Sequence, residues 1–220
     1  MVGIAIISTA ACTSVPVSPE SHGAHIGITL SSHTLIPLKL FDRRFTTIYF
    51  ARLEDEQNDL ISKFPLIPSS ARFGNRFYLL NAPPGRYVAV AAFEQLPGST
   101  VTASGQQSTA GGGYKMNYHA VFSIPLVALT EVKAEQGRLV FMGQFLISVQ
   151  PLMWGPKLDE VQTDVKDRLL GRGSFSRGSV KEVEQGVGSE HNFLMEAQDD
   201  LGESVWGAII QHSQEVLRTK

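Results

Sequence analysis

Six histidines are the residues of this chain best suited to hold a metal ion or to move a proton at neutral pH. They are His22, His25, His33, His119, His191 and His212. No two of them have the His-x-His or His-Glu-x-x-His spacing that places two ring nitrogens on one face of a strand or helix. We expect His22 and His25 to be solvated, and His119 to face outward from a strand. The histidines therefore predict no metal centre.

The serines, glycines and acidic residues do not form a known catalytic or binding motif either. In 171–175 no glycine follows Ser174, so the Gly-x-Ser-x-Gly elbow of the hydrolases is incomplete. Segment 111–115 lacks the Gly-Lys-Ser/Thr ending of a phosphate loop, and 186–188 lacks the third glycine of a dinucleotide fingerprint. The acidic run 54–59 lacks the glycine that a calcium loop needs at its sixth position. We therefore expect no enzyme activity and no cofactor; a hydrolase whose residues meet only in space is the least favoured alternative.

Cys12 is the one cysteine among 220 residues, so no disulfide can form within the chain. An apolar run, 1–7, and a stretch of small residues, 8–11, precede it. That order is typical of a signal peptide with its cleavage site. The apolar run is also shorter than the roughly 20 residues that a transmembrane helix requires.

The segment Ala10-Ala11-Cys12 resembles the cleavage site of bacterial lipoprotein precursors. The resemblance implies cleavage before Cys12, attachment of a diacylglycerol to its sulfur, and acylation of its new amino group. Residues 1–11 would then be a remnant of the signal peptide and 12–24 a lipidated tether, with the protein facing the periplasm or the cell surface. The alternative is a short buried N-terminal strand in which Cys12 is inert.

The composition is that of a globular chain, with 43% hydrophobic and 18% charged residues. Its formal net charge of −2 lacks the basic excess of a nucleic-acid-binding protein. We therefore expect no nucleic acid among its partners.

Residues 25–151 show short apolar runs separated by Gly, Pro, Ser and Asn clusters, which predicts strands rather than helices. About seven or eight strands in succession favour an antiparallel β-sandwich. The predicted strands cover 25–31, 34–40, 46–53, 76–80, 87–94, 118–125, 128–133 and 138–149.

Two turns punctuate these strands. Pro84-Gly85 predicts a hairpin between 76–80 and 87–94, and 135–137 predicts a second one. Segments 80–87 and 137–143 resemble the Leu-x-x-Pro-Pro-Gly-x-Tyr turn and the Gly-x-x-x-Phe-x-Gly strand of lipoproteins with small prealbumin-like or immunoglobulin-like sandwiches. That resemblance implies an exported, membrane-anchored protein without a defined activity.

Residues 157–220 are predicted to form a helical C-terminal region packed on the sandwich. Apolar residues recur at helical spacing from 158 to 169, from about 189 to 201, and from 205 to 217, with a glycine-rich linker between the first two. The alternative is that the stripe around Trp206 is a docking surface for a protein partner or a membrane.

Two functions follow from these patterns. The first is a cell-envelope lipoprotein with a structural or protein-interaction role, anchored to the membrane through lipid on Cys12. The alternative is a periplasmic ligand-binding module that uses the uncharged Gly-, Ser- and Thr-rich loop 96–113.

Overall fold

The computed structural model describes residues 18–20, 22–34, 44–53, 65–96, 100–101, 107–108, 116–152, 157–169 and 173–219. Four predicted features lie wholly or mostly outside these residues. They are the segment 1–17 with Cys12, the strand predicted at 34–40, the acidic run 54–59 and the loop 96–113.

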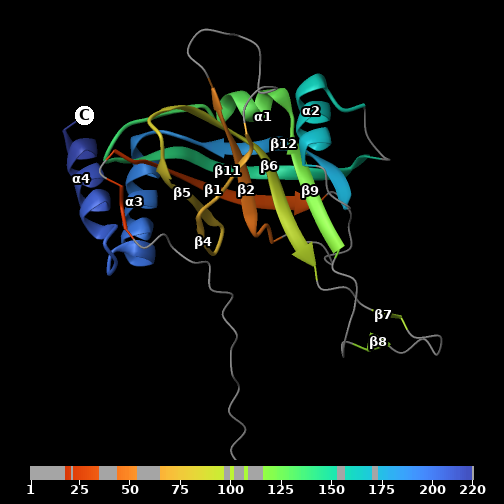
Figure 1. The fold of residues 1–220 in the computed structure, drawn as a ribbon, viewed down its shortest axis with the longest axis horizontal. Coiled ribbons are helices and arrows are strands. Elements are labelled where there is room, and N and C mark those ends of the chain that lie inside the picture. Colours follow the sequence, from red (N-terminus) through yellow and green to blue (C-terminus); the bar gives the residue numbers. More distant parts are fainter. Residues whose placement is uncertain are drawn as a thin grey trace, which may run out of the picture.

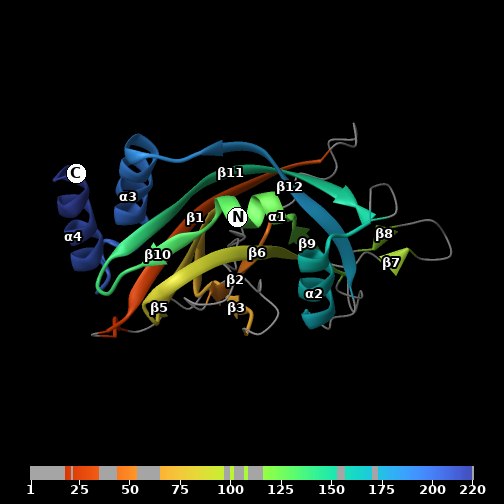
Figure 2. The same cartoon turned by 90° about the horizontal axis from the view of Figure 1, so that it is seen from above.

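The body of the protein is one curled, mixed β-sheet, which Figure 1 and Figure 2 show from two directions. Its strand order among the described residues is β3-β2-β6-β9-β12-β11-β1-β5-β4, with β10 paired to β6; β7 and β8 pair only with each other. The strands are β1 (Ala24–Thr34), β2 (Thr47–Leu53), β3 (Ile67–Pro68), β4 (Ala71–Phe73), β5 (Arg76–Ala82), β6 (Gly85–Leu96), β7 (Thr100–Val101), β8 (Gln107–Ser108), β9 (Met116–Phe122), β10 (Val132–Ala134), β11 (Leu139–Pro151) and β12 (Ser174–Glu184). The helices are α1 (Ile124–Leu129), α2 (Glu160–Arg168), α3 (Val187–Leu201) and α4 (Gly207–Arg218).

The mainly β character and the C-terminal helices are confirmed, but the predicted antiparallel sandwich is wrong. β1 pairs in parallel with β11, and β9 pairs in parallel with β12. Ten of the described strands form one sheet that curls into a half-barrel instead of two stacked sheets. Alternating patterns locate strands without saying which strand lies next to which, and this is why the prediction failed.

Both predicted hairpins are also wrong, although the chain does turn at both places. β5 and β6 flank Pro83 and Pro84, yet β5 pairs with β1 and β4, whereas β6 pairs with β2, β9 and β10. At the second turn Gly137 has a φ of 68°, but β10 pairs with β6 and not with β11. Turn residues fix where the chain bends, while the partner of each strand depends on long-range packing.

The predicted linker after α2 is a central strand. β12 lies between β9 and β11, so residues 25–151 alone do not make the complete sheet. The region 157–220 contains this strand as well as helices. Gly178 lies in this strand, where a Cβ would be 3.0 Å from the ring of Phe122. This glycine and the three serines of β12 hide its strand pattern.

The strand predicted at 128–133 is mostly replaced by α1 and the short strand β10. Pro125 stands at the start of this helix, where its missing N–H costs no hydrogen bond. The predicted helices α2, α3 and α4 are confirmed, with a break after Gly202 between the last two. At the start of α2, the Gln162 N–H donates to Asp159 Oδ1 at 2.7 Å, and the Asp159 N–H donates back to Gln162 Oε1 at 3.1 Å.

The two edges of the curled sheet are joined directly along the chain, since the edge strands β3 and β4 are separated only by Ser69 and Ser70. The Ser69 N–H donates to the Ile48 carbonyl at 2.8 Å, and the Ile48 N–H donates back to Ser69 Oγ at 3.2 Å. On the other side the Ser70 N–H donates to the Tyr78 carbonyl at 2.7 Å, and Ser70 Oγ accepts from the Leu80 N–H at 3.0 Å. Each hydroxyl thereby satisfies a backbone group at the join.

Two apolar cores cover opposite faces of the sheet. The inner core gathers side chains from strands across the sheet together with α1 and α2. The outer core holds α3 and α4 against β4, β5 and β11, and it includes Trp206, which is 1% exposed. Phe193 of α3 lies over Gly27, where a Cβ would come within 2.1 Å of its ring, and it stacks on Phe141 at 4.4 Å. α3 therefore packs closely because β1 carries a glycine there.

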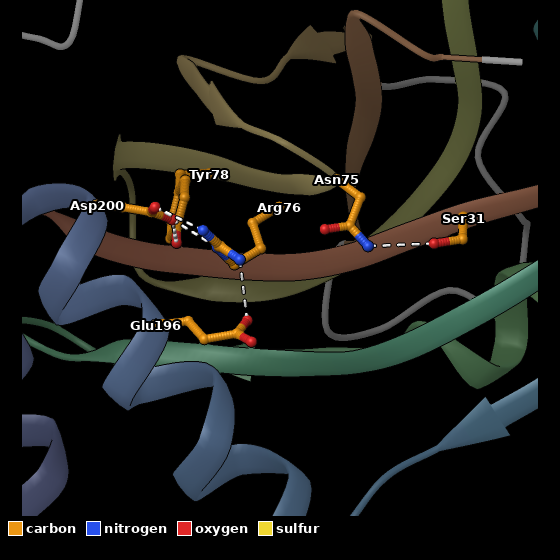
Figure 3. A network of polar contacts seen from close by, with 6 residues as sticks. All are labelled: Ser31, Asn75, Arg76, Tyr78, Glu196 and Asp200. Carbon is orange, nitrogen blue, oxygen red and sulfur yellow. Dashed lines mark hydrogen bonds and ion pairs between the residues drawn. The ribbon is translucent and has the colours of Figure 1, made fainter.

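A polar network on β5 holds α3 in place (Figure 3). Arg76 makes two 2.6 Å hydrogen bonds to the carboxylate of Asp200 and a 3.1 Å bond to Glu196. The Tyr78 hydroxyl donates to the same Asp200 carboxylate at 2.7 Å. Burial, and then this carboxylate, raise the pKa of Tyr78 well above its ordinary value, so the phenol stays a donor.

Replacing Asp200 with alanine should lower the free energy of unfolding by about 2 kcal/mol, less than the 3–5 kcal/mol of a fully buried pair because Arg76 keeps some solvent contact. Urea unfolding measures this loss. The matched control is Asp164→Ala, which removes a solvated i,i+4 pair with Arg168 and should cost less than about 0.5 kcal/mol. Equal losses in the two variants would contradict the role given to Asp200.

Candidate functional site

A cavity of about 310 Å³ opens where the β4–β5 turn meets β1 and the residues that lead into β2. We call it the pocket. It is lined by Leu30, Ser31, Ser32, Arg44, Phe45, Arg72, Gly74, Asn75 and Phe77. A second described cavity, between α1, α2, β2 and β6, holds only about 100 Å³. The larger cavity is therefore the candidate site.

The turn over the pocket is held to β1 by two hydrogen bonds. The Leu30 N–H donates to the Asn75 carbonyl at 2.9 Å, and the Asn75 amide donates to Ser31 Oγ at 3.1 Å. Gly74 has a φ of 59°, which glycine adopts at little steric cost, so the sequence permits this tight turn. Asn75 thus reaches toward β1, while its neighbour Arg76 reaches toward α3 (Figure 3).

The opposite wall comes from the residues before β2. The Thr46 N–H donates to the Phe93 carbonyl at 2.7 Å, and the Arg44 N–H donates to Glu94 Oε1 at 3.1 Å. These bonds fix the backbone on both sides of Phe45. The Phe45 ring can therefore point into the inner core, where it is 3% exposed.

The pocket combines an apolar floor with a polar rim. Leu30, Phe45 and Phe77 are almost fully buried and belong to the inner core. Two serines, two arginines, Gly74 and Asn75 complete the lining. An apolar cavity wall with a few polar groups at one side is the usual form of a small-molecule site.

Charged side chains from separate stretches of the chain meet at the rim. The Arg72 guanidinium lies 5.7 Å from the centre of the Phe77 ring, and its Nε donates to the Gly74 carbonyl at 2.7 Å. Burial lowers the pKa of Arg72 and the nearby Arg44 lowers it further, while Glu94 acts in the opposite direction. Two arginines and one carboxylate of the described residues therefore lie within electrostatic reach of one another at the rim.

Sequence reasoning did not single out these residues as a site. The expected ligand-binding loop 96–113 lies mostly outside the described residues, and the pocket draws on 30–32, 44–45 and 72–77. In the sequence Arg44 belongs to the local charge cluster Asp42-Arg43-Arg44, which by itself favours a turn over an anion site. The other pocket residues carry no motif, because they come from three separate stretches of the chain.

His119 is buried, which corrects the prediction that it faces outward. It lies between Phe93 and Phe175 on the neighbouring strands β6 and β12, with both ring centres 4.9 Å away. Burial lowers the pKa of His119. The neutral ring therefore fills an aromatic row across three strands.

His25 is also buried, at 1% exposure, so the prediction of a solvated side chain is wrong for this residue. Its ring meets Trp206 edge to face at 5.1 Å, and its Nδ1 accepts the Asn81 N–H at 3.2 Å. Burial lowers its pKa from 6.5 to about 4. Like His119, His25 serves packing rather than a visible site.

The four remaining histidines are exposed; they are His22, His33, His191 and His212. Across the described ranges, no group of three His, Cys, Asp or Glu residues has the geometry to hold a metal ion. No helix in the same ranges is both long enough and apolar enough to cross a membrane.

Comparisons of this chain with protein-family models, curated proteins and solved structures find no match. The geometry of the pocket therefore has to carry the functional proposal.

Lowering the pH should destabilise the fold through His25. Its pKa is about 4 when folded and about 6.5 when unfolded, so below pH 6.5 the unfolded chain takes up a proton that the folded chain excludes. The contribution of neutral, buried His25 to the free energy of unfolding is complete above pH 6.5. It is lost as the pH falls toward 4, with a loss of about 2 kcal/mol by pH 4.5. Urea unfolding at several pH values measures this slope.

His25→Gln should make that slope shallower, because glutamine has no proton to gain, and the remaining slope includes the share of buried His119. His33→Gln, at an exposed position, is the matched control and should keep the slope of the original chain. A slope that persists unchanged in His25→Gln would show that His25 is not the group responsible.

Proposed function

We propose that this domain binds a small molecule in the pocket. The supporting observation is the combination of three buried apolar side chains with a polar rim on one side of a 310 Å³ cavity. This volume lies at the lower end of the range of about 300–1,000 Å³ found for small-molecule sites. Binding, rather than catalysis, is favoured because no described residue on the rim pairs a nucleophile with a base.

The volume also limits the size of the occupant. At about 30 Å³ for each water molecule in the liquid, the cavity corresponds to roughly ten waters. We therefore expect a ligand of about ten non-hydrogen atoms, far smaller than a folded partner.

Filling the pocket should abolish binding. Leu30→Trp places an indole in the floor, so a compound that raises the melting temperature of the original chain should leave this variant unchanged. The probes are small carboxylates, alcohols and amines of about ten non-hydrogen atoms. Differential scanning fluorimetry gives the readout, and circular dichroism checks the fold of each variant.

Two further variants complete this test. Ser31→Trp narrows the rim without altering the core, so it should lose binding even where Leu30→Trp folds poorly. Leu129→Trp, at an exposed position on α1, should bind as the original chain does. A stabilising compound that acts equally on all three variants, or the absence of any stabilising compound, would contradict a ligand site here.

We further propose that lipid on Cys12 anchors the domain in the bacterial cell envelope. The support is the order of the N-terminal segment, in which an apolar run and Ala10-Ala11 precede Cys12. β1 begins at Ala24, twelve residues after Cys12. At about 3.3 Å per extended residue, this length of chain reaches at most about 40 Å. The domain would then stand close to the membrane surface.

An alkyne fatty acid fed to a bacterial host that expresses the full chain should label it through Cys12. Cys12→Ala should lose both the label and membrane fractionation, whereas the control Ser18→Ala should keep them. Two or three acyl chains make this anchoring stable, where one chain alone is marginal. An unlabelled original chain, or Cys12→Ala that still fractionates with membranes, would contradict the anchor.

A further inference from the structure

We infer that the pocket selects an amphipathic anion, in which a carboxylate or phosphate head meets Arg44 and Arg72 and a short alkyl body lies on Leu30, Phe45 and Phe77. This inference rests on the proposed function, since it names the chemistry of the ligand that the pocket would take.

The floor requires an apolar body. Leu30 comes from β1, Phe77 from β5 and Phe45 from the approach to β2, and each is at most 3% exposed. Water in contact with these groups gains few hydrogen bonds, and an alkyl chain that replaces it removes apolar surface from solvent. A purely polar ion, such as inorganic phosphate, would leave this part of the pocket unfilled.

The rim requires a negative head. Arg44 and Arg72 line the same cavity from different elements, and burial and then the charge of Arg44 lower the pKa of Arg72. Glu94 raises the pKa of Arg72, and its Oε1 accepts the Arg44 backbone N–H at 3.1 Å. A carboxylate or phosphate has oxygens that can accept charge-assisted hydrogen bonds from both guanidinium groups.

The Arg72 fork is held in place before any ligand arrives. Its Nε bond to the Gly74 carbonyl and the Phe77 ring beneath it restrict the rotation of the guanidinium. Ser31 lines the same pocket; its hydroxyl oxygen accepts from Asn75, and its proton can be donated to an anion. Preorganised donors of this kind bind an anion at a lower entropic cost than a flexible lysine.

Isothermal titration of the full chain with four probes tests the charge and the chain separately. Octanoate and octyl phosphate carry an anionic head on an alkyl body, 1-octanol has the same body without charge, and inorganic phosphate has charge without a body. We expect saturable binding of one or both alkyl anions and no saturable binding of phosphate. Octanol should bind more weakly than the better anion, by about tenfold or more. The better of the two anions identifies the head group as a carboxylate or a phosphate.

Charge-removing variants assign the head group to the rim. Arg44→Gln and Arg72→Gln should each weaken binding of the anion by about tenfold and leave octanol unaffected. Arg44 is exposed, so its variant carries the test even where Arg72→Gln loses stability. The matched control is Arg86→Gln, an arginine that pairs with Glu131 outside the pocket and should leave binding unchanged.

The outcomes separate this inference from the proposed function. Equal binding of octanol and octanoate, both lost in Leu30→Trp, would overturn the anion preference and leave a ligand site in place. Failure of all four probes, while another compound binds in a Leu30-dependent way, would overturn the inference alone. Failure of every compound would overturn both.

Discussion

Strand β1 buries both of its faces, and the rest of the structure depends on this constraint. From Ala24 to Leu30 its described residues are all buried. Ile26, Ile28 and Leu30 belong to the inner core, while Gly27 and His25 meet Phe193 and Trp206 on the outer side. A strand covered on two sides must be paired along both edges, which β11 and β5 provide. α3 and α4 are therefore integral to the fold.

The pocket is a consequence of how the curled sheet closes. Because β3 and β4 follow each other through Ser69 and Ser70, the chain crosses from one edge of the sheet to the other. The crossing brings Arg72 and the β4–β5 turn over the end of β1, opposite Arg44. The apolar floor is the end of the inner core, and the charges gather at its solvent side. The closure of the curled sheet thereby produces both the cavity and the arrangement of an apolar floor below a polar rim.

The buried polar groups divide into two kinds. His25 and His119 are single rings kept neutral by burial against aromatic neighbours. Arg76 and Asp200 instead form a charged pair completed by Tyr78, which ties α3 to β5. Both kinds join elements distant in the chain. The arginines of the pocket differ in lying beside an open cavity, which is why the functional proposal centres on them.

The sequence alone determined the positions of β1, β2, β5, β6, β9 and β11 and of α2, α3 and α4. Periodicity, capping residues such as Asp159, and helix breaks such as Gly202 act over a few neighbouring residues. Tertiary structure decided the parallel pairs, the insertion of β12 between β9 and β11, and the burial of His25 and His119. The tertiary structure also placed Arg44 and Arg72 in the lining of one cavity. Local patterns report how a segment bends and which residues share a face. The neighbour of each strand is set by packing among residues far apart in the chain, and no short window of sequence contains that information.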